Sequence, residues 1–278
     1  MLEVDEKHKP FLQFLGTGSA FTNDFEIKGR QIILNNTQSN AILVGRTGKV
    51  LLIDCGGDIR FSLSLNNIEV SDIDGVYLSH PHADHIGGIE YLALNLCFVL
   101  RKKIDCFGRA DALLLIWKDG LKAGLSTIEG TKSTMDTFFN RKCLPKNGSF
   151  EWDGLQCDIV QVTHVVAERE LMPSYGLLIK CNGKVHFFTS DTQFSPKQIR
   201  TFYQQAVDTG GYIWQDCETS PFKSNVHAHI DDLVSLDAPI KKSMFLYHYN
   251  TKISELAHHD VVKKGFAGFV LPTKRFIL

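Results

Sequence analysis

The sequence lacks the features that mark secreted and membrane proteins. Its seven cysteines are odd in number and no two have CxxC spacing, which favours free thiols over a disulfide framework. No apolar run approaches the ~18 residues of a membrane-spanning helix. The first ten residues are polar, carry charges of both signs and contain no apolar signal-peptide segment. We therefore expect a soluble, cytoplasmic protein without a membrane partner.

An excess of charge is also missing. The 278 residues contain 30 basic and 31 acidic side chains, for a net charge of −1 and a pI near 6.8. The sequence therefore has no overall basic charge of the kind that indicates a protein binding long nucleic acids. With 44% apolar and 22% charged residues, the composition is that of an ordinary globular protein. A core of this size is stable without structural metals, so a bound metal would serve chemistry.

Short β-rich runs alternate with helical patterns. A hairpin is expected around Arg46–Lys49, a strand ending at Ser79, and a helix in the apolar spacing after His85. A further strand is expected over 104–107 and a helix over 110–122.

A second β-rich block begins near Phe150, and its Asn182–Gly183 dipeptide predicts a tight hairpin turn. The segment 120–148 is polar and irregular, and reads as a lid, a dimer contact or a solvated loop. Strands and helices alternate without a clear boundary. We therefore expect one α/β domain over 1–278, a four-layer αββα sandwich of two similar halves.

The segment from Ser79 to His85, SHPHADH, places three imidazoles and a carboxylate directly after the expected strand. Neutral imidazole nitrogens and carboxylate oxygens are good ligands for zinc and related metals. Alternation in the extended part directs His80 and His82 to one side, and the turn directs Asp84 and His85 to a second position nearby. One motif thus predicts two metal sites, which suit displacement at phosphorus or hydrolysis of an acyl bond.

HPHADH resembles the HxHxDH signature of the metallo-β-lactamase superfamily, and the resemblance extends over about residues 12–250. It implies two divalent metal ions, zinc or alternatively manganese. It also implies that Asp54, in LLIDCGG, orients the metal-binding loop through hydrogen bonds. The ligands that the resemblance implies are His80, His82, His164 and Asp191 for one ion, and Asp84, His85, Asp191 and His248 for the other.

Within the superfamily, FLGTGSAF resembles the opening of ribonuclease Z and its cyclic-nucleotide phosphodiesterase relatives. The later DCET and VHAH blocks resemble the same branch. This resemblance implies that His227 protonates the leaving alkoxide, that Glu218 orients or tunes His227, and that His229 supports the site. Asp84 is counted among the catalytic residues as well as the ligands. The branch is commonly homodimeric, so a homodimer is expected.

The interval from His164 to Asp191 departs from ribonuclease Z, because it leaves room for one hairpin and not for a long tRNA-gripping arm. A small phosphodiester such as a cyclic nucleotide is therefore the expected substrate. The alternatives are a tRNA 3′ endonuclease, a lactone or thioester hydrolase, and a metal-binding protein without catalysis. Three aromatics near the motifs, Phe21, Phe222 and Tyr249, are candidates to stack on a base.

Overall fold

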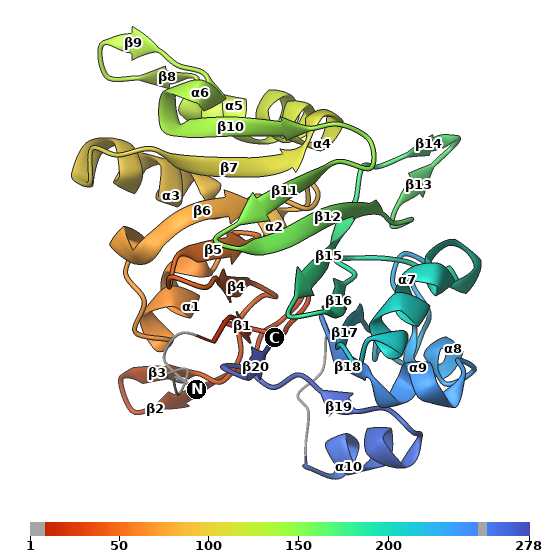
Figure 1. The fold of residues 1–278 in the computed structure, drawn as a ribbon. Coiled ribbons are helices and arrows are strands. Elements are labelled where there is room, and N and C mark those ends of the chain that lie inside the picture. Colours follow the sequence, from red (N-terminus) through yellow and green to blue (C-terminus); the bar gives the residue numbers. More distant parts are fainter. Residues whose placement is uncertain (1–8, 250–254) are drawn as a thin grey trace, which may run out of the picture.

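Two seven-stranded sheets form the centre of the computed structural model, which describes residues 9–249 and 255–278 (Figure 1). The first sheet has the order β10 (Phe139–Leu144), β7 (Ile104–Arg109), β6 (Ile73–Tyr77), β5 (Val50–Ile53), β4 (Ala41–Val44), β1 (Phe11–Phe14) and β20 (Arg275–Ile277). The second has the order β11 (Ser149–Trp152), β12 (Leu155–Gln161), β15 (Tyr175–Cys181), β16 (Lys184–Phe188), β17 (Ile213–Asp216), β18 (Met244–Tyr247) and β19 (Gly268–Phe269).

Each sheet has an antiparallel part and a parallel part. In the first sheet, β5, β6, β7 and β10 run parallel, and the remaining pairs are antiparallel. In the second sheet, β16 to β19 run parallel, and β11, β12, β15 and β16 pair antiparallel. The carboxyl ends of neighbouring parallel strands meet at one edge, where open α/β sheets place their ligands. The two parallel sets therefore provide two such edges.

Helices cover the outer face of each sheet. Against the first sheet lie α1 (Ile59–Leu65), α2 (Ala83–Ile86), α3 (Ile89–Leu94), η3 (Asn95–Val99), α4 (Ala110–Leu115), η4 (Ile116–Leu121), α5 (Lys122–Leu125) and α6 (Met135–Phe138). Against the second lie α7 (Pro196–Asp208), α8 (Ile230–Leu233), α9 (Ala238–Lys242) and α10 (Glu255–Lys263). A third apolar cluster fills the space between the sheets. The expected four-layer sandwich is confirmed. Among the described residues, no helix is long and apolar enough to cross a membrane.

The local expectations are largely confirmed. Arg46–Lys49 joins β4 to β5, and Asn182–Gly183 joins β15 to β16. Both turn residues have positive φ, 50° for Asn182 and 78° for Gly183, as a tight hairpin turn of this sequence requires. The strand expected to end at Ser79 is β6, which ends two residues earlier at Tyr77.

Two expectations were wrong. The 120–148 segment is not irregular, since it contains the hairpin of β8 (Thr127–Ile128) and β9 (Thr131–Lys132), then α6 and β10. Polar residues are typical of an exposed edge strand such as β10, which explains why this strand resembled a loop in the sequence. The interval from His164 to Asp191 holds two hairpins, because β13 (Val166–Ala167) and β14 (Glu170–Leu171) precede β15 and β16.

A substitution at Gly176 on β15 tests whether the packing of β15 against β16 sets the position of Asp191. A Cβ at Gly176 would lie 2.5 Å from the carbonyl oxygen of Phe188 and 2.6 Å from that of Thr189, so the end of β16 must shift. We expect Gly176→Ala to lose about 1–3 kcal/mol of stability in denaturant titrations and also to lose bound metal. Gly183→Ala, with φ of +78° and open space around it, is the control. It should lose about 1–2 kcal/mol and keep its metal. Full metal content in both variants would contradict this prediction.

Candidate metal centre

The polar residues of the site lie where strands of the two sheets end. From the first sheet come Asp54 after β5 and the HPHADH segment after β6. From the second sheet come His164 after β12, Asp191 after β16, Asp216 at the end of β17 and His248 after β18. The carboxyl edges of the two parallel sets therefore face each other across one site.

Three of these strand ends contain a non-glycine residue in the left-handed conformation. The φ angles are 62° at Asp54, 55° at Ser190 and 63° at His248. Each such residue costs on the order of 1–2 kcal/mol and persists only where the surrounding structure fixes it. Here the sharp bend directs the side chains of Asp54, Asp191 and His248 away from the strand and toward the site.

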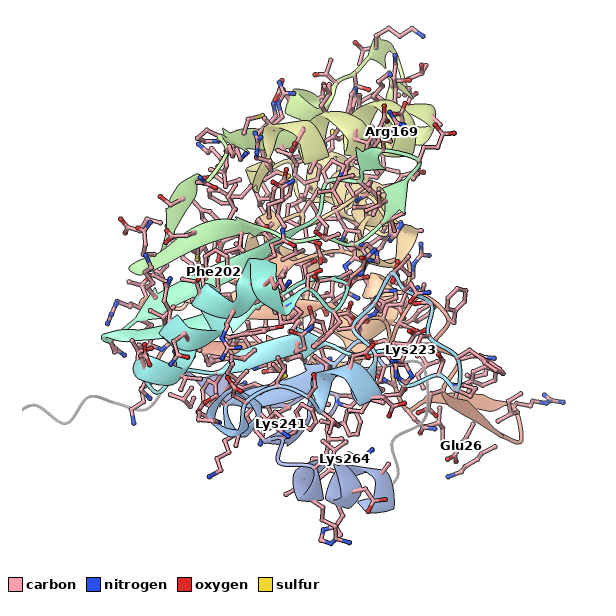
Figure 2. All side chains as sticks on the ribbon, turned by 90° about the vertical axis from the view of Figure 1, so that its right-hand side faces the viewer. Glu26, Arg169, Phe202, Lys223, Lys241 and Lys264 are labelled. Carbon is pink, nitrogen blue, oxygen red and sulfur yellow. The ribbon has the colours of Figure 1, made fainter. Side chains whose placement is uncertain are left out.

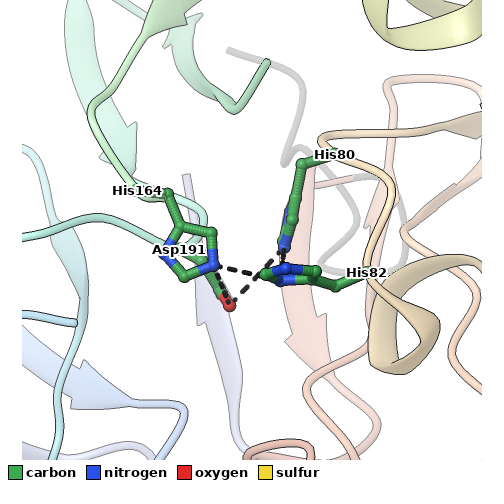
Figure 3. A group of neighbouring side chains, drawn as sticks. All are labelled: His80, His82, His164 and Asp191. Carbon is green, nitrogen blue, oxygen red and sulfur yellow. Dashed lines mark hydrogen bonds and ion pairs between the residues drawn. The ribbon is translucent and has the colours of Figure 1, made fainter. Parts of the chain in front are cut away.

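A first group of side chains consists of His80, His82, His164 and Asp191 (Figure 3). The Nδ1 atom of His82 lies 3.2 Å from Nε2 of His80 and 3.1 Å from Nε2 of His164. Oδ2 of Asp191 lies 3.6 Å from the His80 nitrogen and 3.7 Å from the His164 nitrogen. Three imidazoles and one carboxylate thus direct their ligand atoms at one point.

A second group consists of Asp84, His85, Asp191 and His248, all buried. Nε2 of His248 lies 3.2 Å from Oδ2 of Asp84 and 3.3 Å from Oδ2 of Asp191. Nε2 of His85 lies 3.4 Å from Oδ2 of Asp84 and 3.3 Å from Oδ1 of Asp191. The structure therefore brings all seven expected ligands together, with Asp191 common to both groups.

The ligand atoms of both groups fit metal ions by their spacing and because several of them have no hydrogen-bond partner. Ligand atoms around a tetrahedral zinc ion with bonds of ~2.0–2.1 Å lie ~3.3 Å apart, close to the separations in both groups. Both oxygens of Asp191 and Nε2 of His85 are buried and make no hydrogen bond within residues 9–249 and 255–278. A buried carboxylate in this state is costly unless a cation pairs with it.

The outer nitrogens of the histidines have partners that fix the ring orientations. Nδ1 of His85 lies 2.7 Å from Oδ2 of Asp54, and the backbone N–H of Ser79 donates to Oδ1 of Asp54. Nδ1 of His80 lies 2.9 Å from Oγ of Ser79, and Nδ1 of His164 lies 2.7 Å from the carbonyl oxygen of Val226. Such contacts are typical of metal-ligating histidines. Asp54 thus forms hydrogen bonds with the metal-binding loop, as the resemblance implied.

The electrostatics of the cluster favour positive charge. Burial alone would lower the pKa of His248, but the carboxylates of Asp191, Asp216 and Asp84 raise it to about 10. Burial opposes ionisation of Asp191, but the neighbouring histidines hold its pKa well below the ordinary value. Protons and metal ions compete for such sites, since ligands must be deprotonated to bind a metal.

Asp216 is a site residue that the sequence reasoning missed. Its Oδ2 accepts a hydrogen bond from Nδ1–H of His227 at 2.8 Å and from the backbone N–H of Thr192 at 2.8 Å. Its Oδ1 lies 3.3 Å from Nδ1 of His248. The run YIWQD, an apolar strand ending in aspartate like LLID and FFTSD, was the signal that could have identified it.

The printed contacts of Glu218 and His229 differ from those that their expected roles would need, and the roles stay predictions. The partner that orients His227 is Asp216, whereas the carboxylate of Glu218 accepts hydrogen bonds from Ser220 and Ser224. Nδ1 of His229 accepts the backbone N–H of Asp231 and caps α8, and its Nε2 lies 2.9 Å from the carbonyl oxygen of Ser220. His229 therefore contacts the loop at Ser220 and caps the start of α8.

A cavity of about 110 Å³ opens beside the centre and is lined by Ser19, Ala20, Phe21, Glu218, Ser224, Val226, His227 and His248. Phe21 is 85% exposed and Phe222 is 82% exposed. Tyr249 is buried, and its hydroxyl is shared between Thr17 and the carbonyl oxygen of Val270. Of the three candidate stacking residues, Phe21 lines this cavity and Tyr249 is a core residue.

Solved structures share this fold at low sequence identity. The metallo-β-lactamase fold protein YhfI from Bacillus subtilis matches with a TM-score of 0.71 at 15% identity, covering 96% of this chain and 99% of that chain. The short form of human tRNase Z matches with a TM-score of 0.65 at 14% identity, covering 96% and 99%. The two facing sheets thus define a protein of the metallo-β-lactamase fold.

The chain belongs to the family of the anti-Pycsar protein Apyc1, whose profile matches residues 11–276. The anti-Pycsar protein Apyc1 of Bacillus phage 010DV004 is 31% identical, over 98% of this chain and 100% of that protein.

Asp191→Asn tests whether one carboxylate serves both groups. An amide cannot supply two anionic oxygens, so we expect metal content, measured by elemental analysis after dialysis, to fall for both ions together. Asp158→Asn is the matched control, because Asp158 lies on β12 and forms a surface ion pair with Lys180. It should keep full metal content. Loss of only one ion from Asp191→Asn would show that the two sites do not share this ligand.

Proposed function

We propose that the chain is one hydrolase domain that binds two divalent ions, zinc or manganese, and hydrolyses a cyclic mononucleotide or a similar small phosphodiester. The observation that carries the proposal is Asp191, whose two buried oxygens belong to both ligand groups. His80, His82, His164 and Asp191 would hold one ion, and Asp84, His85, Asp191 and His248 the other. When bound, the ions would lower the pKa of water toward neutrality and offset charge on the phosphate.

Asp84 has a role besides binding. Its Oδ2 faces His85 and His248, and no hydrogen bond within the described residues occupies its Oδ1. We assign this second oxygen the task of accepting a hydrogen bond from the attacking water. That bond orients a lone pair of the water toward phosphorus, which is the positioning that displacement needs.

His227 is the proton donor to the leaving oxygen. Asp216 accepts its Nδ1–H, which leaves Nε2 to face the substrate. Burial disfavours a charged imidazole here, but the Asp216 carboxylate raises the pKa of His227 above its ordinary value. A protonated imidazole beside the leaving group is suited to general acid catalysis.

The surroundings of the site favour a small substrate over tRNA. The arm after His164 consists of β13 and β14, two residues each, with Arg169 at its turn (Figure 2). A strand pair this short offers little surface for a folded RNA. The net charge of −1 also gives no field to attract a polyanion.

His227→Ala tests the assignment of the general acid. We expect it to keep its metal content and to lose about 100-fold or more in kcat on a 3′,5′-cyclic mononucleotide, whose alkoxide leaving group needs a proton. Its loss should be much smaller on bis(p-nitrophenyl) phosphate, because nitrophenolate leaves without protonation. His186→Gln, a buried histidine that hydrogen-bonds the backbone N–H of Tyr212 far from the ligands, is the control.

The same assay tests the function itself. Metal-loaded wild-type protein is given cyclic mononucleotides, a precursor tRNA, a lactone and a thioester. We expect turnover of the cyclic nucleotides in preference to the others. Faster cleavage of the tRNA or of an acyl substrate, with no turnover of cyclic nucleotides, would refute the proposal.

We also propose that two copies associate through the hairpin of β2 (Phe25–Lys28) and β3 (Gln31–Leu34), which stands away from the main sheets (Figure 1). Ile27 and Ile32 on this hairpin are each 68% exposed. A two-stranded hairpin is marginally stable alone in water, and exposed apolar clusters mark interaction sites. A cavity of about 470 Å³ lies between the hairpin and Phe61 of α1.

The double variant Ile27→Lys/Ile32→Lys tests this contact. Two charges in an apolar interface should convert a dimer to a monomer, as measured by light scattering during size-exclusion chromatography. Val99→Lys, which replaces an equally exposed apolar residue on η3, should remain a dimer. A monomeric wild-type protein, or a double variant that stays dimeric, would contradict the proposal.

A further inference from the structure

Glu218 lies beside the proposed general acid but takes no part in orienting it. Its backbone N–H donates to the carbonyl oxygen of Ala228, and its carbonyl oxygen accepts the N–H of Ile230. Glu218 is therefore paired with His229 in an isolated parallel bridge, two residues after His227. Both side chains line the same cavity next to the metal centre.

The carboxylate of Glu218 is fixed by hydrogen bonds and keeps one acceptor position. Oε2 accepts two, from the backbone N–H of Ser224 at 2.9 Å and from its Oγ–H at 3.0 Å. Oε1 accepts at most one, because the single Oγ–H of Ser220, whose oxygen lies 2.9 Å away, also faces the carbonyl oxygen of Phe222. A carboxylate has about four lone-pair sites, so Oε1 has one left for a donor in the cavity. Figure 2 labels Lys223 on the loop that contains both serines.

The carboxylate of Glu218 can bind a hydroxyl group of a ligand. Within residues 9–249 and 255–278, Glu218 forms no ion pair with a lysine or arginine, and the nearby Lys223 pairs with Asp232. Glu218 is also buried, at 9% exposure. A fixed, partly desolvated carboxylate binds hydroxyl groups well, and dinucleotide-binding folds use one on a ribose hydroxyl.

The cavity that Glu218 lines is small, with a volume of about 110 Å³. Phe21, at the exposed side of the cavity, offers a ring on which a base can lie. The carboxylate of Glu218 and the ring of Phe21 thus lie on one cavity beside the metal centre.

We propose that Glu218 accepts a hydrogen bond from the ribose 2′-hydroxyl and makes the enzyme selective for ribonucleotides over 2′-deoxyribonucleotides. The inference rests on the proposed function. The 2′-hydroxyl is adjacent to the 3′-oxygen, as Glu218 is adjacent to His227. The oxygen of water bonds to phosphorus and one proton of that water passes to the solvent. The bond from phosphorus to the 3′-oxygen breaks, and His227 gives that oxygen its own proton. The product is a nucleoside 5′-monophosphate with a free 3′-hydroxyl.

The test compares 3′,5′-cyclic AMP with its 2′-deoxy analogue on the metal-loaded protein. We expect kcat/KM of the wild type to favour the ribonucleotide by about tenfold or more, as a hydrogen bond to a charged group implies. In Glu218→Ala the ratio should fall to about one, because only the ribonucleotide loses a contact. Glu218→Gln keeps the shape of the side chain and serves as the second variant in case the alanine variant fails to fold. It should give an intermediate ratio.

Phe21→Ala is the control from the same cavity, since it should slow both substrates equally and leave the ratio unchanged. Calorimetry with 5′-AMP and 5′-dAMP gives the same comparison without catalysis. A wild-type ratio near one, or a ratio that survives Glu218→Ala, would overturn the inference while turnover persists. Absence of all cyclic-nucleotide turnover would instead refute the proposed function, and the binding ratio would still decide the role of Glu218.

Discussion

The buried carboxylate of Asp191 is the constraint on which the site depends. Its two oxygens make no hydrogen bond within the described residues, yet imidazole nitrogens from four other positions lie within 3.3–3.7 Å of them. Such an arrangement favours positive charge at its centre, for which protons and metal ions compete. It also requires both sheets, because Asp191 and His248 come from the second and the HPHADH segment from the first.

The packing between the sheets therefore sets the ligand distances. Phe14 and Tyr77 of the first sheet lie in one apolar cluster with Trp214 and Tyr247 of the second. The rings of Phe14 and Tyr247 are 5.2 Å apart, and Tyr247 directly precedes the ligand His248. A close-packed core transmits small displacements, so a cavity made here would move one half of the ligands relative to the other. Stability and metal binding are coupled through this cluster.

Much of this site was predictable from sequence because its signals are local. An apolar run that ends in histidine or aspartate shows both a strand and the residue that leaves it, and this pattern applies to Asp54, His164, Asp191 and His248. The partners of His227 were not predictable in the same way. They depend on the order of β16, β17 and β18, which places Asp216 between His227 and His248. The spacing of residues in the sequence does not predict the order of strands in a sheet.

The charge of the site also bears on the size of its substrate. Asp54, Asp84, Asp191 and Asp216 would repel a phosphodiester, so the proposed cations that compensate them would also be the source of attraction for the substrate. That attraction is short-ranged, because at physiological ionic strength it is screened within ~8 Å. A small phosphodiester places its whole charge inside this range. A long polyanion places only one linkage there and meets a surface of near-zero net charge beyond it.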